Sequence, residues 1–159
     1  MRRSDREIKE LEHIIEVIKK CEVCRVALND EEYPYILPLN FGFGIEEGQV
    51  VLYFHGATEG TKYLLIARDP RASFEMDCSH RLVLEEDTGN CTMEYECVIG
   101  RGRMEIVTDY EKKKEALDIL MGQYHAGDFQ YNEAIIDHTT VMKLIVQQMT
   151  GKKRMVATK

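Results

Sequence analysis

One segment organises this chain: a strand that runs directly into a glycine-bearing loop, Gln49-Val50-Val51-Leu52-Tyr53-Phe54-His55-Gly56-Ala57-Thr58-Glu59-Gly60-Thr61-Lys62. Residues 49–55 are rich in β-branched and aromatic side chains, which favours a strand. Residues 63–67 are typical of a short helix, and Asp69 ends it because a residue that precedes proline is disfavoured in the helical region. The segment therefore predicts a strand, a loop and a helix in succession.

The loop in this segment carries the groups that bind a phosphate. Gly56 and Gly60 let the backbone approach a ligand, and the start of the following helix offers free N–H groups. Thr58, Thr61 and Lys62 add two hydroxyls and an ammonium group. The pattern matches neither the Walker A loop nor the dinucleotide fingerprint, which argues against nucleoside triphosphate hydrolysis. A glycine-bearing turn with a solvated lysine is the alternative, and composition alone does not separate the two.

Before this segment the chain predicts two further extended stretches. Residues 23–29 alternate as a strand, and residues 33–41 form an extended segment that contains Pro34 and Pro38. Proline cannot donate to a strand ladder, so we expect residues 33–41 to form an edge strand. The glycines and acidic residues of 42–48 predict a turn, which gives an antiparallel meander up to the central strand.

The second half of the chain predicts more strands and a capped helix. The strands cover residues 71–77, 80–86, 93–107 and 139–149. Gly100 and Gly102 lie inside the longest of them, where glycines are typical of a bulge or a bend at a barrel corner. Asp109 predicts the N-cap of a helix over residues 111–123.

An N-terminal helix completes the pattern. Ser4 and Glu7 predict a capping box, and apolar residues recur behind it at helical spacing up to Ile18. The sum is six or seven strands and about three helices. This predicts an α+β fold of mainly antiparallel strands, built around a β-barrel.

The size and charge of the chain limit its function. With 159 residues it suffices for a single domain, 1–159, and we expect the basic end, 152–159, to be a flexible tail. The net charge of −7 argues against a general nucleic-acid binder, which needs basic surface. No apolar run is long enough to span a membrane, and the N-terminus lacks the apolar centre of a signal peptide. We therefore expect a cytoplasmic protein.

The cysteines and one histidine are the remaining candidates for chemistry. An odd number of cysteines favours reduced thiols over a disulfide framework; they are Cys21, Cys24, Cys78, Cys91 and Cys97. The spacing of Cys21 and Cys24 from Cys78 and His80 does not fit a zinc site, so we predict no metal. No thioredoxin-like pattern surrounds Cys21 and Cys24. His55, at a strand end, is either catalytic or a hydrogen-bonded structural residue.

Four motifs in order resemble a known family. They are Tyr35-Ile36-Leu37-Pro38-Leu39-Asn40-Phe41-Gly42, Leu52-Tyr53-Phe54-His55-Gly56-Ala57, Gly60-Thr61-Lys62 and Tyr95-Glu96-Cys97-Val98-Ile99-Gly100-Arg101-Gly102. From about residue 2 to residue 153 the chain resembles the nitroimidazole-resistance (Nim) branch of the pyridoxamine 5′-phosphate oxidase-like flavoproteins. It lacks the arginine-rich pattern of the pyridoxamine phosphate oxidases proper, so vitamin B6 oxidation is not expected.

The resemblance implies a split β-barrel homodimer with FMN at the subunit interface. Residues 37–40 would run beside the flavin ring, with the missing N–H of Pro38 facing it, and residues 55–62 would grip the phosphate. His55 would take the catalytic role. Cys97 stands where relatives tend to carry a small polar residue, often serine, and a thiol is a poorer donor. The implied FMN-binding residues are Leu37, Pro38, Leu39, Asn40, His55, Gly56, Ala57, Thr61, Lys62, Cys97 and Val98.

Two functions follow from this resemblance. The first is an FMN-dependent oxidoreductase that reduces nitroimidazoles or similar small electron acceptors, with a reduced nicotinamide as a transient donor. The second is a non-catalytic module that binds, stores or senses flavin, and a haem or deazaflavin binder in the same fold is a third. The sequence does not name the physiological substrate or donor. Tyr131, Lys152 and the loop around Gly127 are candidates for contributions from the second subunit.

Overall fold

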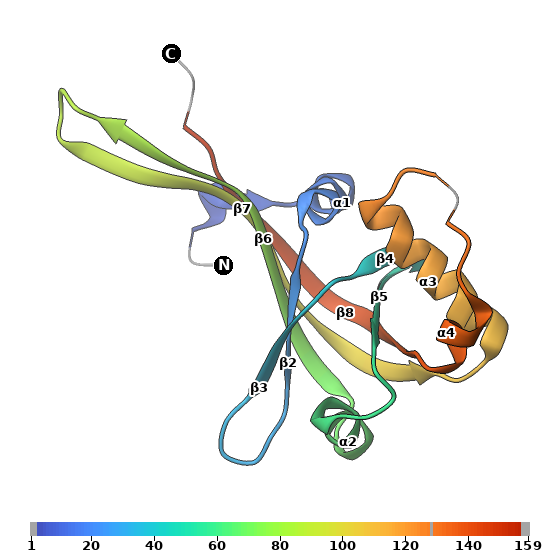
Figure 1. Cartoon of the computed structure of the whole chain (residues 1–159). Coiled ribbons are helices and arrows are strands. Elements are labelled where there is room, and N and C mark those ends of the chain that lie inside the picture. The colour runs from blue at the N-terminus through green and yellow to red at the C-terminus, as the bar shows by residue number, and fades with distance from the viewer. Residues whose placement is uncertain (1–2, 128, 157–159) are drawn as a thin grey trace.

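Antiparallel strands joined in a single sheet make up most of the structure (Figure 1). The computed structural model describes residues 3–127 and 129–156. Along the sheet the strand order is β3-β2-β6-β7-β8-β5-β4, and β1 pairs with the far end of β8. The predicted α+β class with mainly antiparallel strands is confirmed, with eight strands in place of six or seven.

The elements have the following bounds. The strands are β1 (Glu7–Ile8), β2 (Cys24–Leu28), β3 (Tyr35–Leu39), β4 (Gly42–Glu46), β5 (Gln49–Gly56), β6 (Arg71–Glu85), β7 (Asn90–Val107) and β8 (Thr140–Arg154). The helices are a 3₁₀ turn (Ser4–Arg6), α1 (Leu11–Lys20), α2 (Thr61–Arg68), α3 (Tyr110–Tyr124) and α4 (Glu133–Asp137).

The sheet closes on itself because its two edge strands are consecutive in the chain. β3 forms one edge and β4 the other, yet only Asn40 and Phe41 lie between them. Such a short connection requires the edges to approach each other, so the sheet curls into a barrel. Phe41 is fully buried at this junction, where its backbone N–H donates to the Tyr124 hydroxyl over 2.9 Å.

The central strand β5 is buried on both faces. Val50, Leu52 and Phe54 belong to the barrel core, while Val51 and Tyr53 pack on the other side with residues of α3 and α4. This two-sided burial explains the unbroken apolar run in the sequence. α2 covers the end of the barrel at which β5 ends (Figure 1). Its residues Leu65 and Ile66 are part of the barrel core.

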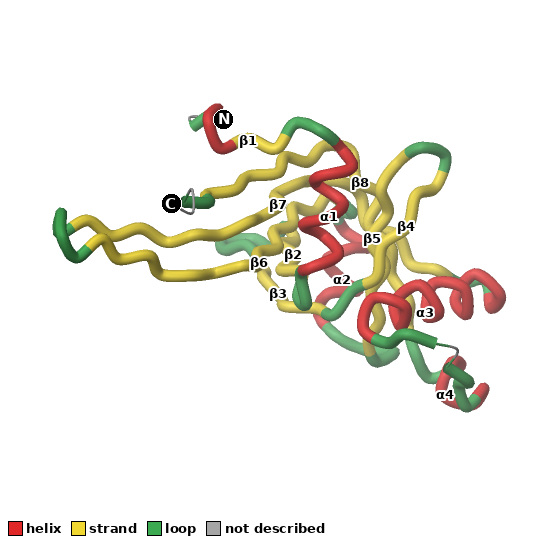
Figure 2. Tube along the Cα trace, turned by 90° about the horizontal axis from the view of Figure 1, so that it is seen from above, coloured by secondary structure: helices red, strands yellow, loops and turns green. Residues whose placement is uncertain are grey.

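A long hairpin projects from the barrel. The outer halves of β6 and β7 continue past the body of the molecule, as both views show (Figures 1 and 2). Leu82 pairs with Met93 and Leu84 with Cys91, so these apolar residues share a face of the hairpin. Leu82, Leu84 and Met93 are exposed there.

The N-terminal capping box predicted at Ser4 and Glu7 is wrong. Residues 4–6 form a 3₁₀ turn, and α1 begins only at Leu11. Ile8 pairs with Gly151 on β8 and is buried in the core. Strand pairing with a distant part of the chain therefore replaces the first turn of the predicted helix.

The predicted meander is also wrong. Residues 42–46 form β4, not a turn, and the reversal is confined to Glu47 and Gly48, both at positive φ. β5 then pairs with β4 and β8 and not with β3. The strands expected at 71–77 and 80–86 are a single strand, β6, with an irregularity between Cys78 and Arg81.

Other local predictions are confirmed. The Asp109 side chain accepts from the backbone N–H of Lys112 over 3.0 Å and caps α3. The β7–β8 register shifts between Arg101 and Gly102, as expected for a glycine bulge. The flexible tail does not begin at residue 152, because residues 152–154 pair with β7; residues 157–159 lie outside the described part. Among the described helices, none has the length and apolar character needed to cross a bilayer.

Candidate functional site

The loop between β5 and α2 is closed by its own side chains. Gly60 precedes α2 with φ 146°, in the region that favours glycine. The Tyr63 hydroxyl donates to the carbonyl of Ala57 and fixes the middle of the loop. The Lys62 ammonium lies 4.3 Å from the centre of the Tyr63 ring, and a Cβ atom added at Gly56 would be 3.2 Å from Lys62 Nζ. Lys62 is therefore folded back over the loop.

The electrostatics of this loop favour an anion. Within residues 3–127 and 129–156, Lys62 makes no ion pair, and the first turn of α2 contains no acidic residue. Gly60 offers no side chain to cap the helix, so the first N–H groups of α2 stay available. The positive end of the helix and the Lys62 ammonium lie at the same loop, and Thr61 adds a hydroxyl at the first position of α2, the kinds of group that a phosphate binds.

His55 lies next to this loop, at the end of β5. It pairs with Val141 on β8 and is on the same face of β5 as Tyr53. Its side chain is exposed on one side, while the protein packed around the ring lowers its pKa below the usual value. His55 is therefore a neutral imidazole at neutral pH, able both to donate and to accept a hydrogen bond.

The residues predicted on β3 divide between the two faces of the strand. Leu37 and Leu39 pack against the barrel core, while Pro38 is exposed on the outside. β2 is the strand partner of β3 in the described part of the chain, which confirms the predicted edge position. Asn40 Nδ2 donates to the carbonyl of Glu22 over 3.4 Å. A ligand on the outside of β3 would meet Pro38 and backbone, and not the leucine side chains.

Cys97 and Val98 also face opposite ways. Val98 is fully buried in the barrel core, so its side chain cannot meet a ligand on the outside of the barrel. Cys97 lies on the outer face of β7, between Asp77 of β6 and Lys152 of β8. Burial raises the pKa of Cys97, which keeps the thiol protonated.

The structure separates the predicted residues into two groups within one chain. His55 is in register with Val141 on β8, which pairs with Val107 at the end of β7. Cys97 lies ten residues earlier on β7. At about 3.3 Å per residue, this is roughly 33 Å along the strand. The α2 loop is thus at one end of the sheet and Cys97 toward the other, so a small ligand cannot touch both in the same chain.

Two tyrosines that the sequence did not single out help to build the site. Tyr63 closes the loop beside Lys62. The Tyr124 hydroxyl donates to the Glu22 carbonyl over 2.8 Å and accepts from Phe41 N–H, which braces the β3–β4 junction. Neither belongs to a motif. The position of Tyr63, one residue after Lys62, is the only local signal that pointed to its role.

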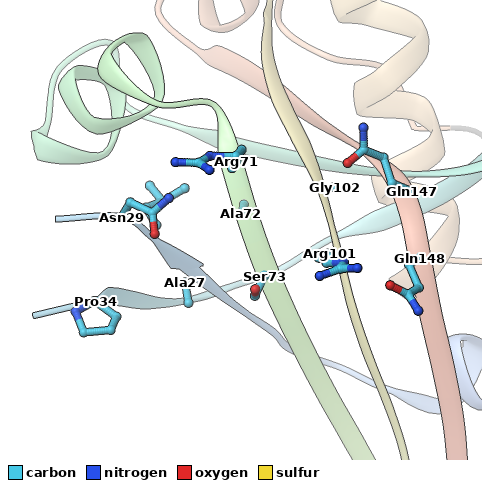
Figure 3. Close-up of a pocket in the computed structure, with 11 residues that line it drawn as sticks. Ala27, Asn29, Pro34, Arg71, Ala72, Ser73, Arg101, Gly102, Gln147 and Gln148 are labelled. Atoms are coloured by element: carbon cyan, nitrogen blue, oxygen red, sulfur yellow. The ribbon is translucent and has the colours of Figure 1, made fainter.

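A cavity of about 600 Å³ lies on the outer face of the sheet, across β2, β6, β7 and β8 (Figure 3). The side chains of Arg101 and Gln148 come from paired positions on β7 and β8, and Ser73 pairs with Arg101 from β6. The cavity is therefore rich in hydrogen-bond donors. None of the site residues predicted from sequence lines it.

Comparison with sequence families identifies a match over most of the chain. The sequence model described as pyridoxamine 5′-phosphate oxidase matches residues 10–153. Comparison with curated proteins gives no match.

Solved structures with the same fold include several flavoproteins. A candidate 5-nitroimidazole antibiotic resistance protein from Bacteroides thetaiotaomicron is 32% identical, with a TM-score of 0.81 over 92% of this chain and 86% of that one. The flavocytochrome Anf3 from Azotobacter vinelandii is 19% identical, with a TM-score of 0.80 over 98% and 72% of the two chains. The FAD and heme binding protein from Mycobacterium smegmatis is 18% identical, with a TM-score of 0.79 over 97% and 76%. At 19% and 18% identity, the similarity to the last two structures shows a common fold and no more.

Proposed function

Because this chain belongs to the pyridoxamine 5′-phosphate oxidase family, we propose that it binds FMN and passes electrons from it to nitroimidazoles or similar small acceptors. The observation that carries this proposal is the α2 loop, where Lys62 is held over Gly56 without an acidic partner in the described residues. The similarity to a candidate nitroimidazole resistance protein supports the choice of acceptor.

The α2 loop would hold the phosphate of FMN. Lys62 would offset its charge, and the first N–H groups of α2 and the Thr61 hydroxyl would donate to its oxygens. Gly56 makes room for the Lys62 and Tyr63 side chains to fold over the loop, and the Tyr63 hydroxyl bonds to the Ala57 carbonyl, so the loop is already ordered by its own contacts. These residues fit FMN better than a dinucleotide, whose fingerprint the sequence lacks.

The neighbouring residues would position the ring system. FMN when bound would supply the electron transfer to the acceptor. His55, exposed beside the loop and favoured in its neutral form, would hydrogen-bond to the ring or to the acceptor through its imidazole nitrogens. The exposed Pro38 on edge strand β3 would let the ring lie against the edge of this strand that does not pair with β2.

The site would be completed by a second copy of the chain. The separation of His55 and Cys97 along the sheet means that one FMN can meet both only if they come from different copies. The outer face that carries Cys97 also carries an unpartnered apolar row along β6 and β7. Its members are exposed by about half or more: Met93 47%, Ile99 52%, Leu82 58% and Leu84 61%. Burying this row against its counterpart would favour a homodimer.

Spectroscopy and titration test the cofactor assignment. The purified protein, mixed with FMN, should quench the fluorescence of the flavin and retain its yellow colour through gel filtration. The same titration with FAD and haem distinguishes the cofactors that proteins of this fold bind. Protein that leaves FMN fluorescence unchanged while it takes up haem would overturn the proposal.

Reaction without oxygen separates an enzyme from a flavin-binding module. The FMN-loaded protein is mixed with a reduced nicotinamide and then with a nitroimidazole. Bleaching of the flavin followed by its reoxidation by the nitro compound is expected. A flavin that stays oxidised for many minutes would favour storage or sensing over catalysis.

The dimer is tested by a charge placed in the apolar row. Ile99→Glu should shift the protein from dimer to monomer in sedimentation and weaken FMN binding at the same time. Ile135→Glu, at an exposed apolar residue of α4, is the matched control and should change neither. Full FMN affinity in a monomeric Ile99→Glu protein would show that one copy suffices.

A further inference from the structure

Two cysteines that are distant in sequence meet where α1 ends beside β6. Cys21 directly follows α1 and is buried, and Cys78 on β6 packs against the same apolar core. Their neighbours tie the two segments together, because Lys20 Nζ and Ser79 Oγ both bond to Oε2 of Glu96, over 2.8 and 2.9 Å. Burial raises the pKa of the Cys21 thiol, and its neighbour Cys78 raises it further as a hydrogen-bond partner. Glu96 is also the strand partner of Cys78 on β7, so the end of α1 that carries Cys21 lies beside Cys78.

Cys78 is the member of this pair that a small oxidant can reach. It is only partly buried. The backbone after it is not held by regular pairing, since Ser79 has φ 59° and the β6–β7 register shifts before Arg81. Cys21 lies deeper, with its Sγ donating to the Val17 carbonyl over 3.2 Å. Cys78 also lines a cavity of about 390 Å³ together with Lys20, Ser79 and His80.

The other cysteines are poorly placed to compete. Cys97 is on the strand next to Cys78, but Cys97 pairs with Asp77, and successive residues of a strand point to opposite faces. Cys97 therefore faces Lys152 while Cys78 faces the core and Cys21. Cys24 is fully buried on β2, and Cys91 is exposed on the projecting hairpin.

We propose that Cys21 and Cys78 are a redox-modification site, at which a peroxide forms a reversible disulfide that ties α1 to β6. The Cys78 thiolate attacks the peroxide, so that an S–O bond forms, the O–O bond breaks and the leaving oxygen takes up a proton as water. Cys21 then attacks the Cys78 sulfur, the S–S bond forms, and the oxygen leaves with the proton of Cys21 as a second water. The pair loses two electrons and the peroxide gains them.

Two polar groups lie close to Cys78. The ammonium of Lys20, next in sequence to Cys21, is bonded to Glu96, the strand partner of Cys78. The Ser79 hydroxyl lies 3.6 Å from the Cys78 sulfur. The site is independent of FMN, because none of these residues belongs to the α2 loop or to the outer row that carries Cys97.

Thiol mapping of the whole protein tests the site. The reduced chain is treated with hydrogen peroxide, the oxidant is removed, the protein is unfolded in guanidinium chloride so that every remaining thiol is alkylated with N-ethylmaleimide, and the intact mass and peptides are measured. Two of the five cysteines should be protected, the linked peptides should contain Cys21 and Cys78, and dithiothreitol should restore alkylation at both. Alkylation of all five, or a linkage of Cys78 to another cysteine, would overturn the proposal.

Variants identify the step at which each sulfur acts. Cys78→Ser, at a partly exposed position, should abolish protection of Cys21, whereas Cys91→Ser should leave the disulfide intact. In Cys21→Ser, Cys78 should react with dimedone as a sulfenic acid. Oxidation should also raise the thermal midpoint of the wild type and not that of Cys78→Ser, because a cross-link restricts the unfolded chain. A disulfide that persists in Cys78→Ser would refute the assignment.

Discussion

Two glycine pairs of this molecule, Gly100 with Gly102 on β7 and Gly56 with Gly60 in the α2 loop, have different physical causes. A Cβ atom at Gly100 would lie 2.4 Å from the Phe74 ring, and one at Gly102 would lie 2.0 Å from the carbonyl oxygen of Ile145. A Cβ atom at Gly56 meets only the side chains of Lys62 and Tyr63.

The difference lies in what each pair makes room for. The pair on β7 lets the Phe74 ring and the backbone of β8 approach β7 closely, so the barrel could not pack in this way with larger residues there. The pair in the loop lets the side chains of Lys62 and Tyr63 fold over the backbone, and Gly60 has φ 146°; within the described residues, Lys62 has no acidic partner there. The same residue type thus serves the fold in one region and the proposed ligand in the other.

The largest effect is expected at Gly102. Gly102→Ala places a methyl group against backbone that cannot move aside, and overpacking of this kind costs about 3 kcal/mol or more. Urea denaturation measured by circular dichroism should show this loss, or the protein should fail to accumulate in folded form. Wild-type stability in Gly102→Ala would contradict the close approach of the Ile145 backbone to Gly102 at the β7–β8 bulge.

The next effect concerns the loop and should leave the fold intact. Lys62→Ala removes a charge-assisted contact to the phosphate and should weaken FMN binding by about 1.5–3 kcal/mol. Fluorescence titration measures the affinity, and thermal melting without FMN should match the wild type. Lys19→Ala, an exposed lysine on α1 at the opposite end of the barrel, is the control (Figure 1). Equal affinity in the two variants would contradict the phosphate assignment.

Gly122 has neither of these reasons to be a glycine. Gly122 lies in α3, where an added Cβ atom has no neighbour within 4 Å. Gly122→Ala should therefore stabilise the protein by about 0.5–1 kcal/mol through the lower entropy of the unfolded chain. Denaturant unfolding of Gly122→Ala, measured together with Gly102→Ala, checks this prediction. A lower free energy of unfolding in Gly122→Ala than in the wild type would mean that the steric room at a glycine does not predict the effect of alanine.

The smallest effect is the pH dependence of stability due to His55. Its folded pKa is lowered by burial, so the unfolded chain binds the proton more readily. The neutral histidine favours the fold above its ordinary pKa of about 6.5, and this contribution is lost as pH falls through the folded pKa. His55→Gln should flatten part of the loss in thermal midpoint between pH 7 and pH 5. An unchanged pH profile would show that His55 titrates normally.

The parts of the fold that depend on neighbouring residues were predictable. The β5–loop–α2 unit follows from an apolar run, two glycines and a proline, and the Asp109 cap of α3 follows from one side chain and the next turn. The edge position of β3 follows from Pro38, which cannot donate to a ladder. The candidate phosphate loop belongs to this class, because its groups lie within eight residues of His55.

Partners across the sheet were not predictable in the same way. Ile8 has helical spacing with the residues that follow it, yet it pairs with Gly151 on β8. Residues 42–46 have the glycines and acidic residues typical of a turn, yet they form β4 and pair with β5. Register between distant strands is decided by which faces can be buried together, and a local window of sequence contains no record of that choice.

The amino-acid sequence alone determined the local pieces: which stretches extend, where glycine opens space, and which loop gathers an ammonium, hydroxyls and free N–H groups. Only the tertiary structure decided that β3 and β4 become opposite edges of a closing sheet, that Cys21 and Cys78 pack against the same core, and that His55 and Cys97 lie toward different ends of the sheet. The physical reason is the separation along the chain of the residues that each effect joins. Propensity and capping act over a few residues, whereas pairing and burial join residues that only the folded chain brings together.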